Sequence, residues 1–165
     1  IRAKVRMGDY CTVTNNSTLE GLIRFGEGVR IMSHVYIPSR TWFGDRVFVG
    51  PGTIFLNDRA PGRLENPPTP RGATLGDDVM IGGGCTILPG IKIGARSFIA
   101  AGTLVTRDVP PHSFVRGRPG VIEKLPAHLD RPAAPQLWRQ PHDIWHPLAD
   151  HATALQWPED WSEQF

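Results

Sequence analysis

Side chains that can do chemistry gather in one irregular stretch of this chain, from Phe55 to Gly76. The stretch is rich in proline and arginine and carries Asn57, Asp58 and Arg59 in succession. Amide, carboxylate and guanidinium groups can hydrogen-bond a polar ligand from several directions. Taken alone, Asn57 is equally the residue type that tolerates a left-handed corner or caps its own loop. Its role therefore depends on the scaffold that holds it.

Histidine offers a second set of candidates. Three interpretations of His34 are open: an ordinary exposed side chain, a ligand contact, or a general base. The last role suits histidine because imidazole titrates near neutral pH. Near the C-terminus stand three more, at His142, His146 and His151. The prolines and tryptophans around those three favour packing over metal coordination, so we expect no metal site.

The totals favour one small domain with many turns. The chain has 165 residues, 40% of them hydrophobic, with 18 glycines and 16 prolines, which favours short strands over long helices. The formal charge of +2 is too small for non-specific nucleic-acid binding, and fifteen of the eighteen basic residues are arginine, which suits phosphates and carboxylates.

The apolar runs and the cysteines indicate where the protein works and whether it contacts a membrane. No apolar run approaches the ~20 residues that cross a bilayer, and no secretory signal opens the sequence. Two cysteines, Cys11 and Cys85, make no disulfide framework. We therefore expect a cytoplasmic protein with neither a membrane nor a nucleic acid as partner.

The candidates are positioned by an internal repeat of six residues. Every sixth residue is large and apolar, and the residue two places before it is small or β-branched. Against a 40% hydrophobic background, such a run arises by chance roughly once in a million. The large positions are Ile1, Met7, Val13, Leu19, Phe25, Ile31, Ile37, Phe43, Val49 and Phe55, then Leu75, Ile81, Ile87, Ile93, Ile99 and Val105.

Two inward positions separated by one outward position describe a short strand. The other residues of each six must turn a corner. Glycine follows the large residue at intervals of eighteen, at Gly8, Gly26 and Gly44 and again at Gly76 and Gly94. Three sixes therefore make one turn of a parallel β-helix of triangular section, with coils about 4.8 Å apart. Both cysteines fall on inward small positions, where we expect inert thiols.

The irregular stretch interrupts this repeat. From Phe55 to Leu75 the chain spans twenty residues, two more than one coil. We expect it to leave a corner, run out as a protruding loop over residues 57–72 and return on the same six-residue period. A loop held at both ends by a rigid scaffold is a good place for specificity.

With these motifs the chain resembles the hexapeptide-repeat acyltransferases, built on a left-handed parallel β-helix, from about Val5 to Val121. It looks like the branch that N-acetylates amino groups on nucleotide-linked sugars. The shared cues are Phe-x-Asn-Asp at 55–58, a Gly-Ala-x-Leu-Gly restart at 72–76 and Val-Pro with a following Gly-x-Pro at 109–119. The family usually continues Gly-Asn-Pro-Ala-Arg, where this chain reads Gly117-Arg118-Pro119-Gly120-Val121.

The resemblance implies transfer of an acetyl group from acetyl-CoA to a nucleotide-linked amino sugar, a precursor of cell-surface polysaccharide. It also implies a homotrimer with its sites in the grooves between β-helices. It makes Asn57 catalytic, its amide oxygen accepting a hydrogen bond from the attacking amine. Asp58 and Arg59 are expected to position the substrate, and the loop to form one wall of the sugar-nucleotide pocket. A sugar amine with a pKa of about 8 needs no strong base, so orientation can supply most of the rate.

For acetyl-CoA the resemblance suggests a slot along the later coils. Small outward residues would admit the pantetheine arm, and arginines would meet the coenzyme phosphates. For each glycine the alternative to coenzyme binding is a corner that requires glycine. For each arginine it is a side chain that is simply solvated. The small residues are Gly82, Gly83, Gly84, Ala100 and Ala101, and the arginines are Arg107, Arg116 and Arg118.

Three rival functions are considered. His34 as base would suit O-acetylation of a sugar, serine or antibiotic, since a hydroxyl is a far weaker acid than an ammonium ion. A non-catalytic interaction scaffold would require neither Asn57 nor a coenzyme slot. A carbonic anhydrase of this fold would need three histidines around zinc; the coils hold only His34, with His112 at their exit, which excludes it.

The sequence therefore predicts a β-helix domain over residues 1–121 and an irregular C-terminal extension over 122–165. The extension holds four of the five tryptophans and no repeats of six. Pro126 to Asp130 is expected to form a helical turn. The extension is a candidate for mediating oligomerisation or for covering the coenzyme end of the site.

Overall fold

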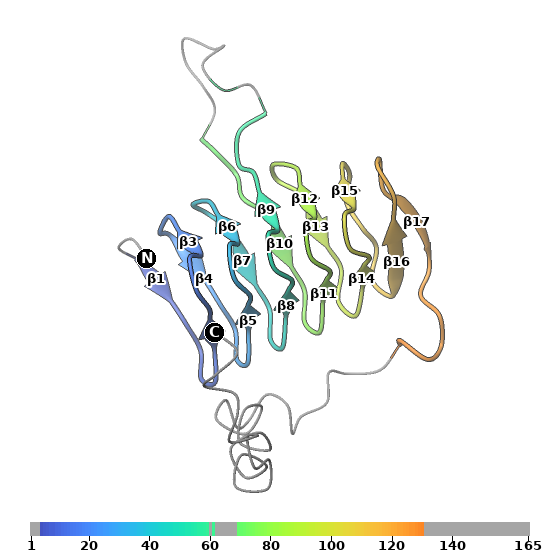
Figure 1. The fold of residues 1–165 in the computed structure, drawn as a ribbon, viewed down its shortest axis with the longest axis horizontal. Helices are drawn as coiled ribbons and strands as arrows, with labels where there is room; N and C mark the ends of the chain where they lie inside the picture. The colour runs from blue at the N-terminus through green and yellow to red at the C-terminus, as the bar shows by residue number, and fades with distance from the viewer. Residues whose placement is uncertain (1–3, 60, 62–68, 131–165) are drawn as a thin grey trace, which may run out of the picture.

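The computed structural model describes residues 4–59, 61 and 69–130. In this part the chain is all β, with seventeen strands wound into one continuous coil (Figure 1). It holds no helix with the length and apolar character needed to cross a bilayer. The expectations for His142, His146 and His151 lie outside the described residues, as do those for half of the protruding loop, residues 60 and 62–68.

The strands form three sheets, which are the three faces of a prism and are named here by their first strand. The β1 face comprises β1 (Val5–Arg6), β4 (Ile23–Arg24), β7 (Trp42–Phe43), β10 (Thr74–Leu75) and β13 (Lys92–Ile93). The β2 face comprises β2 (Thr12–Val13), β5 (Arg30–Ile31), β8 (Phe48–Val49), β11 (Met80–Ile81), β14 (Phe98–Ile99), β16 (Ser113–Arg116) and β17 (Val121–Lys124). The β3 face comprises β3 (Thr18–Leu19), β6 (Tyr36–Ile37), β9 (Ile54–Phe55), β12 (Thr86–Ile87) and β15 (Leu104–Val105).

Strand pairing confirms that three repeats make one coil. Val5 pairs with Ile23 and Thr74 with Lys92, both parallel and eighteen residues apart. Each coil therefore stacks in register on the one before, and the fold is the expected left-handed parallel β-helix. The chain runs from the β1 face to the β2 face, then the β3 face, and back.

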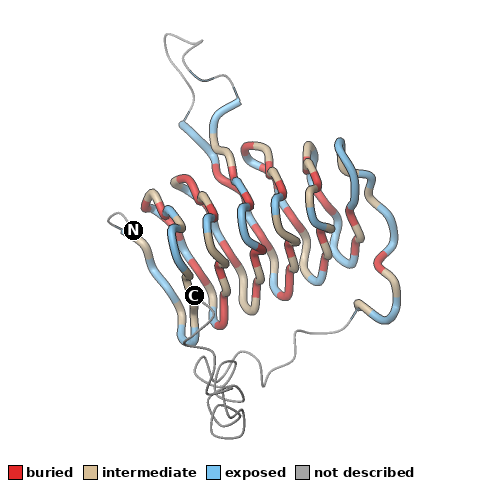
Figure 2. The backbone as a smooth tube through the Cα atoms, viewed as in Figure 1, coloured by how far each residue is buried: buried red, intermediate tan, exposed pale blue. Residues whose placement is uncertain are grey.

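Inward positions form one core along the prism (Figure 2). Phe43 packs on Phe25 with ring centroids 4.8 Å apart and meets Phe55 edge-on at 5.7 Å. Inward hydroxyls satisfy themselves on nearby backbone, as when Thr103 donates to the Ala100 carbonyl at 2.7 Å. Met7, at the large position of the first described coil, is 42% exposed, because within the described residues only one coil packs against it.

Two kinds of backbone position recur along the coil. A residue with positive φ recurs every six residues through the regular coils, as at Asn16, Leu22 and Gly28. The glycines spaced by eighteen have a different cause, close stacking between coils. A Cβ on Gly44 would lie 2.8 Å from the Gly76 carbonyl carbon and 2.7 Å from the backbone nitrogen of the following Asp77.

The protruding loop interrupts a single corner. Thr74 pairs with Trp42, thirty-two residues apart, where ordinary partners are eighteen apart. The loop therefore adds fourteen residues to one step between neighbouring faces, β9 to β10, and does not replace a whole coil. Its ends are joined where Arg71 N–H donates to the Asn57 carbonyl at 2.9 Å.

The last coil closes with a hairpin. Phe114 pairs with Phe98, sixteen residues earlier, and β17 then runs antiparallel to β16. After it the backbone turns at Pro126, whose carbonyl accepts from Leu129 and Asp130 N–H groups. The Asp130 carboxylate meets His112 Nδ1 at 2.8 Å, so the chain stays attached to the prism up to the end of the described residues.

Candidate active site

Asn57 lies at the β3/β1 corner, directly after β9, and is half-buried. Its side-chain Nδ2 donates to Ser39 Oγ at 3.3 Å. The strand register stacks five residues at this corner, one per coil: Gly21, Ser39, Asn57, Pro89 and Arg107. Because Ser39 takes up the amide nitrogen, the amide oxygen is left as the group that can accept from a ligand.

The two residues after Asn57 begin the loop. Arg59 folds back along the prism, its Nε and Nη2 donating to the Pro89 carbonyl at 3.3 and 3.2 Å. This contact tethers the start of the loop to the next coil. Asp58 and Arg59 are both exposed at the side of the Asn57 corner.

The coenzyme-slot candidates and His34 share the preceding corner, between the β2 and β3 faces. Successive coils place His34, Gly52, Gly84 and Gly102 there, linked by backbone hydrogen bonds such as Gly102 N–H to the Gly83 carbonyl at 2.8 Å. Arg118 reaches back to this corner, with Nη1 donating to the Gly102 carbonyl at 3.2 Å.

The glycines of the expected coenzyme slot are subject to different structural constraints. Gly84 has a φ of +66° and Gly82 would press a Cβ to 2.5 Å from Ala101 N, so the corner itself requires both. Gly83 is less constrained, since a Cβ there would make a tight contact of 3.1 Å with Pro51 O. Small residues at Gly83 and, on the next coil, at Ala100 and Ala101 suit the approach of an extended ligand.

His34 and Asn57 are not brought together within one chain. They lie at opposite edges of the β3 face, His34 before β6 and Asn57 after β9 one coil later. His34 is exposed, with a φ of +61°. A reaction using both residues therefore needs a second chain.

The three candidate phosphate-binding arginines also separate. Arg107 is exposed at the Asn57 corner, two coils further along, while Arg118 lies at the coenzyme corner. Arg116 pairs with Glu123 across the hairpin at 2.9 Å, and this hydrogen bond raises the pKa of the guanidinium. A phosphate at Arg116 would have to compete with that carboxylate.

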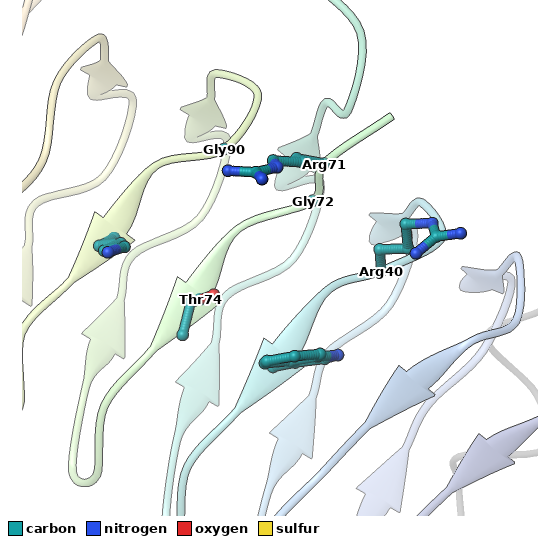
Figure 3. A pocket seen from close by; sticks show the side chains of 7 residues that line it. Arg40, Arg71, Gly72, Thr74 and Gly90 are labelled. Carbon is teal, nitrogen blue, oxygen red and sulfur yellow. The ribbon is translucent and has the colours of Figure 1, made fainter. Parts of the chain in front are cut away.

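Sequence reasoning missed a hollow next to Asn57 on the β1 face. It has a volume of about 280 Å³ and is lined by Arg40, Trp42, Arg71, Gly72, Thr74, Gly90 and Lys92. Figure 3 shows Arg71 extending over Gly90, with Arg40 at the same corner one coil earlier. The available signal was Trp42, a large apolar residue at an outward strand position between cations. We call this cavity the Trp42 hollow.

Two further features bear on the chemistry. No group of three or more potential metal ligands occurs within residues 4–59, 61 and 69–130. Cys85 is buried at 1% exposure, and its Sγ lies 3.2 Å from the Ala100 carbonyl. Burial raises the pKa of this thiol, so it is poorly suited to act as a nucleophile.

Comparison with known proteins agrees with this architecture. The family model "Bacterial transferase hexapeptide (six repeats)" matches residues 72–107. The Bacillus subtilis protein named "Putative acetyltransferase YvoF" is 38% identical over 89 residues, 54% of this chain and 50% of its own length. Serine acetyltransferase 2 of Arabidopsis thaliana is 32% identical over 107 residues, 65% of this chain. The chain spans half of the first relative and 32% of the second.

Solved structures share the fold. The hexapeptide-repeat acetyltransferase VCA0836 of Vibrio cholerae, complexed with acetyl coenzyme A, is 29% identical with a TM-score of 0.60, covering 73% of this chain and 71% of its own. PerB of Caulobacter crescentus, solved with CoA and GDP-perosamine, is 21% identical with a TM-score of 0.64, covering 74% and 52%. In its six-residue repeat, its coil register and its fold, the chain is therefore similar to acetyltransferases of the hexapeptide-repeat kind.

Proposed function

We propose that this protein transfers an acetyl group from acetyl-CoA to the amino group of a nucleotide-linked amino sugar. The observation that carries the proposal is the hydrogen bond between Asn57 and Ser39. The amide nitrogen of Asn57 donates to Ser39 Oγ, which leaves its oxygen available as an acceptor at the base of the loop. Of the two acceptor classes, an amine suits this residue better, because an amide cannot act as the general base that a hydroxyl needs.

The reaction needs no strong base. A sugar amine with a pKa of about 8 is partly neutral at pH 7. Its nitrogen, held by Asn57 Oδ1, attacks the thioester carbonyl, the C–N bond forms and the C–S bond breaks. The proton lost by nitrogen ends on the departing CoA thiolate. Asn57 contributes orientation, which alone can be worth several orders of magnitude in rate.

Acetyl-CoA is expected at the β2/β3 corner. Gly83, Ala100 and Ala101 are small residues along which the pantetheine arm is expected to run, and Arg118 already reaches this corner. We assign Arg118 to the phosphates of a coenzyme bound here, and Arg107, at the Asn57 corner, to those of a coenzyme bound to an adjoining copy. VCA0836, which has the same fold, binds acetyl coenzyme A, which supports the assignment.

The complete site needs a second copy of the chain, and we propose a homotrimer. The Asn57 and coenzyme corners are at opposite edges of the β3 face, so one chain cannot close a cleft around both. The outward row of the β2 face begins with Thr12 and Arg30 and is apolar from β8 onward, with Phe48, Met80, Phe98 and Phe114. A face of this kind marks a protein interface.

The nucleotide and acceptor class draw support from the fold family. PerB, which shares the fold, was solved with GDP-perosamine, so a hexapeptide β-helix accommodates an acceptor of this size. Acceptors of this class serve cell-surface polysaccharide synthesis, and we place the reaction in the cytoplasm. Cys11 and Cys85 are both free thiols, which is usual for proteins of the reducing cytoplasm.

A thiol-release assay tests the proposal. Purified chain and acetyl-CoA are incubated with a panel of amino-sugar nucleotides carrying uridine, thymidine or guanosine, and CoA release is followed with a thiol reagent. We expect acceptor-dependent release with at least one member. Absence of release with every acceptor, amine and hydroxyl alike, would favour a non-catalytic scaffold.

A hydroxyl acceptor is the second candidate. His34 is exposed at the coenzyme corner, where a general base would be needed, and a serine acetyltransferase is among the relatives. The same panel therefore includes serine, maltose and a nucleotide sugar without an amine. Release with these alone would favour His34-dependent O-acetylation.

A further inference from the structure

The β1 face has an outward surface unlike the other two. Register stacks its outward residues, one per strand, and all five are exposed: Arg6, Arg24, Trp42, Thr74 and Lys92. The row thus consists of cations around an indole and one hydroxyl, with no carboxylate. By contrast, the outward row of the β2 face is half-buried and, from Phe48 to Phe114, apolar.

Trp42 is the centre of this face. Its side chain is 58% exposed, unusual for the largest apolar side chain of the prism. It forms a wall of the Trp42 hollow and of a second hollow of about 660 Å³, where Lys4, Arg6, Arg24 and Arg40 are the other charged lining residues. Together the two hollows approach the size of a small-molecule site, about 300–1,000 Å³.

The cations around the Trp42 hollow are not neutralised within the described part of the chain. Arg46 pairs with Asp78 and Arg116 with Glu123 there, but no ion pair involves Arg40, Arg71 or Lys92. The Asp108 carboxylate accepts from the backbone N–H of Lys92 at 2.8 Å. A flat indole beside three cations that form no ion pair among the described residues predicts a ligand with an aromatic ring and negative charge.

The floor of the hollow is backbone held in a fixed position. Gly72 packs so tightly that a Cβ there would collide with the Thr41 hydroxyl and approach the Arg40 backbone at 2.8 Å. Gly90 N–H donates to the Arg71 carbonyl, and Arg71 N–H to the Asn57 carbonyl, both at 2.9 Å. Arg71 therefore joins the hollow directly to the candidate catalytic asparagine.

We propose that the Trp42 hollow binds a nucleoside diphosphate, with the base against the Trp42 indole and the phosphates between Arg40, Arg71 and Lys92. This inference rests on the proposed function and identifies where the nucleotide half of the acceptor is held. From there the sugar extends past Arg71 to Asn57. Coenzyme A carries the same chemistry in its adenosine phosphates, so the test separates the two sources.

The experiment is calorimetric titration of the purified chain with UDP, dTDP and GDP, and separately with CoA. Trp42→Ala and Arg71→Ala are compared with Trp42→Phe, which keeps an aromatic ring. Arg96→Ala is the matched control because Arg96 is an exposed arginine at the β1/β2 corner, remote from the hollow. Circular dichroism melting confirms that each variant folds.

We expect the preferred nucleoside diphosphate to bind at least tenfold more weakly to Trp42→Ala and Arg71→Ala, with Trp42→Phe within about threefold of wild type and Arg96→Ala and CoA binding unchanged. Unchanged nucleoside diphosphate affinity in both alanine variants would overturn the inference. So would a loss confined to CoA, which would assign the hollow to the coenzyme. Since no turnover is measured, failure here leaves the acetyl-transfer assay to decide the proposed function independently.

Discussion

Asn57 Nδ2 and Ser39 Oγ, one coil apart at the β3/β1 corner, lie 3.3 Å from each other. Ser39 thereby determines which end of the amide is presented to a ligand. Asn57→Ala removes the acceptor and is expected to lower kcat about 100-fold, the scale of a lost orienting contact, with the melting temperature little changed. Steady-state kinetics on the best acceptor of the panel measure this.

Ser39→Ala tests the positioning role in the same assay. The substitution keeps the Asn57 oxygen as an acceptor but removes the hydrogen bond that holds the amide. We therefore expect kcat to fall less than in Asn57→Ala. KM for acetyl-CoA should stay constant. A kcat for Asn57→Ala within a factor of about two of wild type would remove this residue from the mechanism.

His34 distinguishes an amine acceptor from a hydroxyl acceptor. His34→Asn keeps a polar side chain that tolerates the observed φ of +61°. With an amine acceptor we expect less than about a fivefold loss of kcat/KM, because no strong base is needed. A loss approaching the 10²–10⁴-fold typical of a missing general base would instead support O-acetylation. Rates over pH 6 to 9 show whether a titrating group disappears.

Gly44 and Gly52 separate two reasons for glycine in a β-helix. Gly52 has a φ of +69° with nothing within 4 Å of its Cβ position, so Gly52→Ala is expected to cost about 1 kcal/mol of backbone strain. Gly44→Ala meets backbone of the next coil at 2.7 Å and should cost about 3 kcal/mol. Denaturant unfolding measures both, and equal losses would contradict the stacking explanation.

Burial is expected to make the Cys85 thiol unreactive in the native chain. Desolvation raises the pKa of its thiol, so the thiolate fraction at pH 8 is lower than for a free cysteine, and little solvent reaches the sulfur. Cys85 is expected to react with a thiol reagent only after denaturation. The linked contribution to stability is present below the ordinary thiol pKa and is lost as pH rises through the raised value. Rapid labelling of Cys85 in the native chain, located by mass spectrometry, would show that the last coils open.

The scaffold was predictable because its determinants are local and repeated. Inward residues such as Ile31 and Ile87 recur at fixed intervals, so an eighteen-residue coil follows from counting alone, and pairing confirms it. Met7 follows the same period, but its exposure of 42% could not be read from periodicity. The faces that the loop joins were not predicted, because only strand pairing shows that it connects neighbouring faces.

The corner positions of the candidate residues were easier to predict than their contacts. The stacking of Asn57 with Ser39 follows from residue numbers once the coil length is known, whereas that of Arg107 also depends on the fourteen residues that the loop adds. The pairing of Arg116 with Glu123 does not, because it arises in a hairpin that leaves the repeat. The Trp42 hollow depends on residues from separate coils and on which cations lack carboxylate neighbours, and neither is visible along a linear sequence.

The most direct test of the account is a crystal structure of the chain with CoA and the acceptor selected by the panel. The account predicts a trimer in which the acceptor amine lies within hydrogen-bond distance of Asn57 Oδ1. The CoA sulfur should lie beside that amine, with the thiol arm passing Gly83 of an adjoining copy. A single chain with Asn57 facing solvent and the coenzyme bound elsewhere would contradict it.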